Sequence, residues 1–228
     1  NRDFLVSLYP EVEQKTVVIP NGVDTKIFNP DAMLPNDLGL RPGYLFFIGR
    51  TVPSKGIETI VAMLDHLPHH VQMVFAFSTK RWDGEKHPKA DYYVDLVSKL
   101  KERRPNVVLI INEWRREVVA GLYANAAMTL APSTYEPCGM ATMESQACCT
   151  PVITNNVGFM KISVEDGING TILKANPQDR DYPKVMAYAI LSLLNDPDLQ
   201  REMGRSGRRN VVKNHTWALR AKPHSDLY

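Results

Sequence analysis

The sequence has little cysteine and no metal-ligating cluster. Of its 228 residues, three are cysteines, at 138, 148 and 149. An odd count with one adjacent pair argues against a disulfide framework and favours a reducing compartment. None of the six histidines belongs to a His-Glu-x-x-His motif or to a Cys/His cluster. We therefore expect no metal site and no metal cofactor.

Long hydrophobic runs and strong net charge are also absent. No stretch reaches roughly 18 consecutive apolar residues, the length that a membrane-spanning helix needs. The first residues lack the basic-then-apolar layout of a signal peptide, so we expect a cytoplasmic protein without a transmembrane segment. The formal net charge is +2 with scattered lysines and arginines, which gives no reason to expect a nucleic-acid partner.

Short apolar segments alternate with longer amphipathic ones. The short segments are rich in β-branched and aromatic residues and predict buried strands at 16–20, 44–50, 71–77, 106–111, 128–132 and 151–154. The longer ones have apolar residues at spacings of three and four and predict helices at 55–67, 89–103, 115–126, 139–148, 183–195 and 197–213. This alternation predicts an α/β fold, a Rossmann-like parallel sheet with helices on both faces.

Ligands of such sheets bind beyond the carboxyl ends of the strands, in the loops that lead into the helices. The loops dense in polar, charged, glycine or proline residues are 49–56, 78–91, 112–117 and 131–140. The longest, 78–91, has the low hydrophobicity of a mobile loop and either closes over a ligand or moves freely.

The loop 49–56 contains two cations, Arg50 and Lys55, between Gly49 and Gly56. Two cations at the carboxyl edge of a parallel sheet suit a diphosphate, because arginine supplies a planar fork of donors and lysine a compact charge. The glycines let the backbone approach a ligand closely. On this loop alone, phosphate binding and an ordinary charged surface are equally good interpretations.

The stretch YEPCGMATMESQACCTPVI, residues 135–153, contains two glutamates. Glu136 precedes a turn, and Gly139 and Met140 begin a helix whose free N–H groups attract anions or sugar hydroxyls. Glu144 lies about one and a half turns into this helix among apolar residues, where an acid needs a partner. A carboxylate can accept both hydroxyls of a ribose. Taken alone, each glutamate is most simply interpreted as a solvent-exposed residue. Together with the basic loop, the two glutamates favour a nucleotide-sugar site.

Four segments, in this order, resemble the C-terminal, donor-binding lobe of retaining glycosyltransferases of the GT-B fold, most closely family four. They are IPNGVDTKIFNP (19–30), IGRTVPSKGIE (48–58), APSTYEPCGMATMESQACCTPVI (131–153) and VEDGINGTIL (164–173). The resemblance runs from about residue 10 to the end, and the glutamate pair is its most specific part. It implies a single C-terminal lobe: a linker from an N-terminal lobe at 1–15, a donor-binding domain at 16–213, and a helix that crosses back at 214–228.

The resemblance also implies roles for individual residues. Arg50 and Lys55 would hold the donor diphosphate, and Glu136 would contact the transferred sugar, which makes these three the expected catalytic residues. Glu144 would bind the nucleotide ribose. The remaining expected donor contacts are Gly49, the backbone amides of Cys138, Gly139 and Met140, and the loop 112–115, which would hold the base near Trp114.

Two positions depart from the family pattern. Members usually carry glycine where this chain has Cys149, so cysteine there must accept a conformation that glycine adopts freely. Where members often read Gly-Gly-x-x-Glu, this chain reads Gly-Phe-Met-Lys-Ile at 158–162. The run Glu-Pro-Cys-Gly also resembles starch and glycogen synthases, although those usually lack an acid at the position of Glu144.

The implied activity is transfer of a sugar from a UDP-, GDP- or ADP-linked donor to an acceptor hydroxyl, with retention at the anomeric carbon and without a metal. The N-terminal lobe would set the acceptor, so the donor lobe alone would be inactive. Three alternatives remain open: a nucleotide-sugar epimerase of the same fold, a glycogen- or starch-synthase-like glucosyltransferase, and a non-catalytic binding module.

Overall fold

The computed structural model describes residues 2–113 and 115–225. Trp114, expected near the nucleotide base, lies outside the described residues. Within them, no helix combines the length and the apolar character that crossing a membrane requires.

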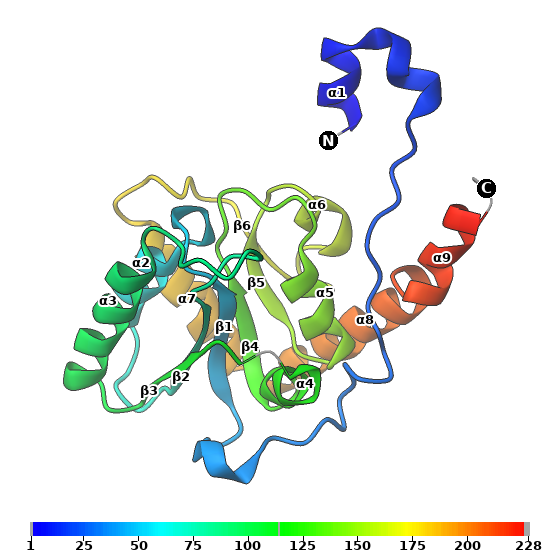
Figure 1. Cartoon of the computed structure of the whole chain (residues 1–228). Coiled ribbons are helices and arrows are strands. Elements are labelled where there is room, and N and C mark those ends of the chain that lie inside the picture. The colour runs from blue at the N-terminus through cyan, green and yellow to red at the C-terminus, as the bar shows by residue number, and fades with distance from the viewer. Residues whose placement is uncertain (1, 114, 226–228) are drawn as a thin grey trace.

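The centre of the molecule is a six-stranded sheet in the order β3-β2-β1-β4-β5-β6 (Figure 1). All neighbouring strands are parallel. This confirms the expected α/β class. The strands are β1 (Tyr44–Arg50), β2 (Met73–Ser78), β3 (Val107–Ile111), β4 (Ala126–Ala131), β5 (Val152–Asn155) and β6 (Gly170–Leu173). Strands β2 and β3 are added on one side of β1, and β5 and β6 on the opposite side of β4. The strand order therefore reverses between β1 and β4, and sheets of this kind bind ligands at the carboxyl ends of the strands at this switch point.

Helices cover both faces of the sheet (Figure 1). One face carries α2 (Ile57–Leu64), α3 (Ala90–Arg103) and α7 (Tyr182–Leu194). The other carries α4 (Arg116–Ala124), α5 (Met140–Ala147) and α8 (Pro197–Asn214). All six lie within a few residues of the expected helices, which is the usual uncertainty of helix ends. The shorter elements are α1 (Arg2–Leu8), η1 (Pro10–Lys15), η2 (Asn36–Leu38), η3 (Pro53–Lys55), α6 (Met160–Ser163) and α9 (Trp217–Ser225).

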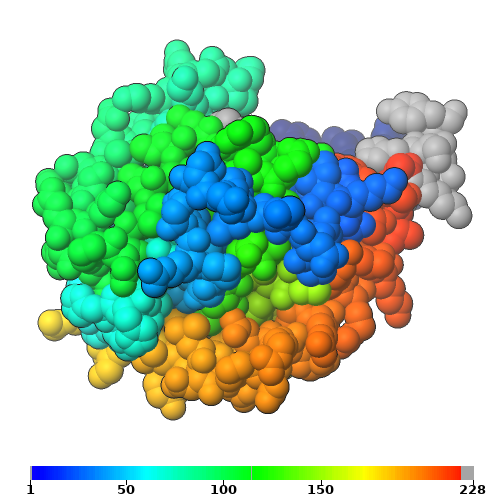
Figure 2. Space-filling model, turned by 90° about the horizontal axis from the view of Figure 1, so that it is seen from below, coloured from blue at the N-terminus to red at the C-terminus, as the bar shows by residue number. Residues whose placement is uncertain are grey.

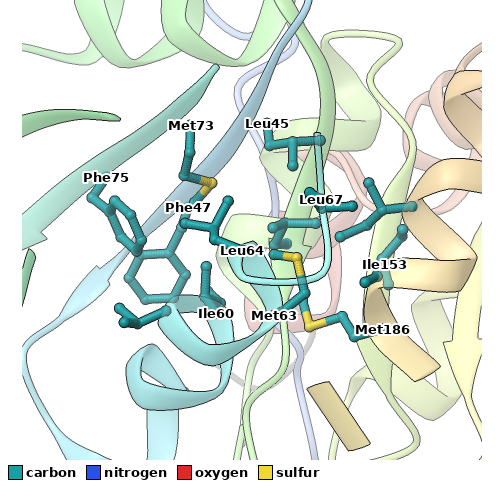
Figure 3. Close-up of a cluster of buried hydrophobic side chains, with 14 of the residues drawn as sticks. Leu45, Phe47, Ile60, Met63, Leu64, Leu67, Met73, Phe75, Ile153 and Met186 are labelled. Atoms are coloured by element: carbon teal, nitrogen blue, oxygen red, sulfur yellow. The ribbon is translucent and has the colours of Figure 1, made fainter. Parts of the chain in front are cut away.

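Each face of the sheet has its own hydrophobic core, because successive side chains of a strand point to opposite faces. In β1, Leu45 and Phe47 join the cluster with α2 and α7, whereas Tyr44 and Phe46 join the cluster with α4 and α5. Figure 3 shows the first cluster around Leu45 and Phe47. Each large apolar side chain that is fully buried contributes roughly 1.5–3 kcal/mol. The two cores therefore fix the strand ends that position the loops.

One strand predicted from the sequence was wrong, and one strand was missed. The run at 16–20 is not a strand: it lies outside the sheet, and Val17 and Val18 are each 62% exposed. The sixth strand is instead β6, which has only four residues and pairs with β5. The β-branched run has no neighbouring strand to pair with, and strand propensity depends on such a neighbour.

The segment before the sheet contacts the start of the C-terminal helix beside the body of the molecule. The backbone N–H of Val23 donates to His215 O at 2.7 Å, and that of Trp217 donates to Val23 O at 3.3 Å. Helix α9 begins at this contact and occupies part of the expected helical segment 214–228. Elements α1 and η1 stand away from the sheet (Figure 1), and in Figure 2 the blue segment that follows them borders the red C-terminal helices, in agreement with the Val23 hydrogen bonds.

Candidate functional site

The basic loop after β1 and the acidic loop after β4 are joined by backbone contacts at the switch point. Thr134 donates its N–H to Ser54 O at 2.9 Å. Gly56 has φ +70°, and a Cβ atom built on it would lie 2.6 Å from the carbonyl oxygen of Pro132. Only glycine permits this close approach in that conformation. The two loops that the sequence singled out separately are therefore one surface.

Lys55 and Glu136 form an ion pair across this surface. The Lys55 ammonium donates to Glu136 Oε2, and the side chains are 16% and 12% exposed. Burial alone would raise the pKa of the Glu136 carboxyl. The hydrogen bond and charge of Lys55, with the backbone N–H groups of Gly139 and Cys138, outweigh it and hold the pKa below its usual value. Glu136 is therefore a carboxylate at neutral pH.

The start of α5 supplies backbone donors beside this pair. Gly139 has φ +66° and donates its N–H to Glu136 Oε1 at 3.1 Å. Thr142 Oγ1 donates to Gly139 O at 2.7 Å and fixes the turn. The N–H of Met140, the first residue of the helix, has no acceptor within the helix, because intrahelical acceptors lie four residues earlier. A phosphate or a hydroxyl oxygen above the turn would meet these donors.

Glu144 lies on the same helix, one turn beyond this start. The Tyr123 hydroxyl donates to Glu144 Oε2 at 3.2 Å. Burial raises the pKa of Glu144 to about 7, and the Tyr123 hydrogen bond and the charge of Arg116 only partly oppose that rise. Glu144 therefore changes protonation near neutral pH. As a carboxylate it can accept two hydroxyl hydrogen bonds from a ligand.

Tyr123 was missed by the sequence reasoning. It lies on α4, which reads as an ordinary amphipathic helix, and its ring packs edge-on against Phe46 at 5.1 Å and Phe28 at 6.1 Å between centroids. Only the fold brings its hydroxyl to Glu144, 21 residues later in the chain. No local pattern signals that contact.

Arg50 ends β1 and remains exposed. Within the part of the chain that the structure describes, its guanidinium has no hydrogen bond or ion pair, so it is not part of the Lys55–Glu136 contact. It is adjacent to that contact through Gly49, because a Cβ atom built on Gly49 would lie 3.7 Å from Cδ of Lys55. The expected residues thus form a continuous rim rather than one hydrogen-bonded group.

Two further segments hold the acidic loop. Asn21 Nδ2 lies 3.1 Å from Cys138 Sγ, so the segment before the sheet reaches the turn. Phe159 donates its N–H to Glu136 O at 3.2 Å, and a Cβ atom on Gly158 would lie 1.8 Å from the same oxygen. The glycine of the 158–162 segment therefore supports Glu136 directly, although the rest of that segment departs from the family pattern.

The other departure, Cys149, has the conformation expected of the glycine it replaces. Its φ is +60°, in the left-handed region. Metal binding has no candidate ligands here: among residues 2–113 and 115–225, no three or more His, Cys, Asp or Glu side chains are grouped so that they could hold an ion.

Comparison with known proteins shows what this chain is similar to. A family model described as "Glycosyl transferases group 1" matches residues 35–210. The chain is 28% identical over 237 residues to the alpha-maltose-1-phosphate synthase of Mycolicibacterium smegmatis, covering 100% of this chain and 60% of that protein. The chain thus spans about 60% of the length of this curated relative.

Two solved structures share the fold. A sucrose-phosphate synthase from Thermosynechococcus elongatus is 28% identical with a TM-score of 0.83, over 100% of this chain and 55% of that one. The Anabaena protein HepE, solved with UDP-glucose, is 18% identical with a TM-score of 0.77, over 94% of this chain and 57% of that one. These are GT-B structures, which confirms the expected fold.

Proposed function

This chain belongs to the group 1 glycosyl transferases, and from that premise we propose that it binds a nucleotide-diphosphate sugar at the carboxyl edge of its sheet. In the complete enzyme the sugar passes to an acceptor hydroxyl with retention at the anomeric carbon. The observation that carries the proposal is the contact of Lys55, Glu136 and the N–H of Gly139 at the switch point.

The chemistry of this contact matches the two halves of such a donor. The ammonium of Lys55 and the amides at the start of α5 face a diphosphate, and Arg50 adds a planar fork of donors at the rim. As the bond between the anomeric carbon and the diphosphate breaks, its electron pair leaves with the diphosphate. Cations already in place stabilise that negative charge without reorganisation, and no metal is required. Glu136 accepts hydrogen bonds from the sugar hydroxyls and orients the ring.

In this proposal Glu144 binds the ribose of the nucleotide. Its carboxylate lies one turn along α5 from the diphosphate donors and accepts hydrogen bonds from the two ribose hydroxyls. Tyr123 holds it in place from α4. The printed title of the HepE structure, a complex with UDP-glucose, supports a nucleotide sugar as ligand.

The acceptor site is proposed to lie outside this chain. The chain spans 60% of its synthase relative and 55% of the sucrose-phosphate synthase structure. An N-terminal lobe that precedes residues 1–15 and packs on α9 would supply the acceptor site. Without it, the donor lobe is expected to bind the nucleotide sugar but not to turn it over.

A thermal-shift titration with UDP-, GDP- and ADP-glucose tests the proposal. A ligand that binds only the folded state adds about 2.7 kcal/mol of stability at a hundredfold excess over its dissociation constant. One of the three donors should raise the melting temperature of the wild-type chain, and Arg50→Ala should weaken the shift. Equal small shifts for all donors in both proteins would contradict the proposal. In the complete enzyme, an epimerised donor formed without any acceptor would indicate an epimerase instead.

A further inference from the structure

Phe159 links the acidic loop to the junction between α8 and α9. Its N–H donates to Glu136 O at 3.2 Å, and its carbonyl oxygen accepts the N–H of Ser163 in α6 at 3.0 Å. Its ring packs edge-to-face with the imidazole of His215, with 5.7 Å between the ring centroids and an interplanar angle of 77°. Both side chains are buried, since Phe159 is 9% and His215 4% exposed. One residue therefore contacts both the backbone of Glu136 and the end of α8.

The segment that contains Phe159 packs directly on Glu136. A Cβ atom built on Gly158 would lie 1.8 Å from Glu136 O, so no free space separates the two backbones. In such close packing a shift of Phe159 also shifts Glu136. The family pattern often has Gly-Gly where this chain has Gly-Phe, and glycine at position 159 would have no ring to pack on His215. The departure from that pattern thus supplies a contact that glycine could not make.

His215 is held in place by three hydrogen bonds. Its N–H donates to Val211 O at 2.8 Å at the end of α8, and its carbonyl oxygen accepts the N–H of Val23 at 2.7 Å. Its Nδ1 lies 2.9 Å from Nη2 of Arg220 in α9. Because an arginine side chain can only donate, Nδ1 is the acceptor and carries no proton. Burial, followed by the charge of Arg220, lowers the pKa of His215, which agrees with a neutral ring at neutral pH.

The two chain segments at this junction cross in close contact. Val23 and Thr216 form a parallel bridge, and a Cβ atom built on Gly22 would lie 2.5 Å from the backbone nitrogen of Trp217. In Figure 1 the blue segment that leads to the sheet passes beside α8 at this point. The ring of His215 therefore has a fixed position, and it can restrain the ring of Phe159 that packs on it.

We propose that His215 is a positioning residue for Glu136. Its ring, packed on Phe159, holds the peptide before Phe159 against the Glu136 backbone and so keeps the Glu136 carboxylate within reach of the hydroxyls of the transferred sugar. The inference rests on the proposed function, in which Glu136 contacts the sugar and the cations of the basic loop hold the diphosphate. It adds that a buried histidine at the junction of α8 and α9 determines how tightly the sugar, and not the nucleotide, is bound.

Titration calorimetry of the chain with a nucleotide sugar and with its nucleoside diphosphate separates the two parts of the donor. The probes are UDP-glucose with UDP, GDP-glucose with GDP and ADP-glucose with ADP, and the pair that binds most tightly is used. The quantity compared between variants is the affinity for the nucleotide sugar divided by the affinity for the diphosphate. In His215→Ala this ratio should fall roughly fivefold, the size expected for loss of an edge-to-face ring contact, while the diphosphate affinity changes less than about twofold.

Further variants test whether the ring contact is the cause. Phe159→Ala removes the other ring and should lower the ratio as His215→Ala does, so it provides the test if His215→Ala is too unstable to titrate. Because the two rings form one contact, the double variant should lower the ratio no further. His215→Phe keeps a ring against Phe159 and should restore the ratio to within about twofold of the wild-type value. Trp217→Ala is the matched control, because Trp217 lies at the same junction but is 47% exposed and bonds to Val23 only through its backbone.

Glu136→Gln separates this inference from the proposed function. It should lower the ratio by itself, and His215→Ala added to it should have no further effect. A ratio unchanged by Glu136→Gln would contradict the proposed role of Glu136 and, with it, this inference. A ratio lowered by Glu136→Gln but unchanged in His215→Ala and Phe159→Ala would overturn the inference and leave the proposed function standing. Equal losses of nucleotide-sugar and diphosphate affinity in His215→Ala would also overturn it, because they would show a merely structural role.

Discussion

The ammonium of Lys55 is hydrogen-bonded to the carboxylate of Glu136, 81 residues later in the chain. The pair connects the loop after β1 to the loop after β4 at the point where the sheet changes direction. In the proposed function, Lys55 is the cation for the leaving diphosphate and Glu136 the carboxylate for the sugar hydroxyls.

The first prediction concerns Lys55→Ala in the complete enzyme. Removing one preorganised group that stabilises developing charge typically lowers turnover by about 100- to 1,000-fold. We expect a loss of this size in an assay of sugar transfer. Lys99→Ala is a suitable control, because Lys99 is exposed on α3 and its ammonium pairs with Asp95 at 2.8 Å. Turnover close to the wild-type value would show that Lys55 is not part of the site.

The second prediction is a pH dependence of donor binding. Burial raises the pKa of Glu144 to about 7, and ribose hydroxyls donate to the charged form. The affinity for a nucleotide sugar should therefore rise by roughly tenfold between about pH 6 and pH 8. A nucleotide sugar is the right probe, because its diphosphate diester does not titrate in this range. In Glu144→Gln the affinity should be low and flat with pH, and an unchanged slope there would assign the titration to another group.

The same pKa also predicts how stability varies with pH. The folded chain holds the Glu144 proton up to about pH 7, whereas the unfolded chain releases it near 4.5, the ordinary value of the carboxyl. Between these values the folded state binds more protons, so the free energy of unfolding falls as pH rises. Urea unfolding should show that Glu144→Gln removes this part of the slope and is relatively more stable above pH 7 than below pH 5.

The third prediction concerns Tyr123→Phe. The Tyr123 hydroxyl lowers the pKa of Glu144 by hydrogen bonding. Its removal should raise that pKa further, so the pH midpoint of nucleotide-sugar binding should move upward while affinity well above pH 8 recovers towards wild type. A merely structural role would lower affinity equally at every pH. That result would contradict a positioning role for Tyr123.

The fourth prediction concerns Cys149. Its φ of +60° lies in the left-handed region, which is strained for any residue that has a Cβ atom. The backbone has no room to relax, because a Cβ on Gly204 of α8 would lie 1.9 Å from Cys149 O, so the helix packs directly on it. Cys149→Gly should stabilise the chain by about 1 kcal/mol, or roughly 2–4 °C in melting temperature. Cys149→Ala keeps the Cβ and should gain little; equal gains in both would show that strain is not the cause.

Sequence patterns predicted most of this fold because the signals are local. Apolar runs and three-and-four spacing gave all six main helices and the strands from β1 to β5. The exposed run with Val17 and Val18 has the same composition as a strand, but pairing depends on a neighbour that the local sequence does not contain. Strand β6 was missed because it follows the turn-like run Asp-Gly-Ile-Asn at 166–169 and begins with glycine, which is depleted in strands.

The sequence predicted those parts of the candidate site that lie in local motifs. The basic and acidic loops were identified separately, and the structure adds that Lys55 and Glu136 touch. Contacts such as Tyr123 with Glu144 join residues from two helices, so no spacing along the chain reveals them. The sequence described 78–91 only as a polar loop, because the backbone hydrogen bonds within it, such as that of the His87 N–H to Thr79 O, leave no mark in the spacing of hydrophobic residues.

A crystal structure of the chain with the nucleotide sugar that stabilises it most is the most direct test of the central claim. We predict the diphosphate on Arg50, Lys55 and the amides that begin α5, the sugar beside Glu136, and the ribose on Glu144. A nucleotide bound elsewhere, with these four side chains directed away from it, would contradict the account.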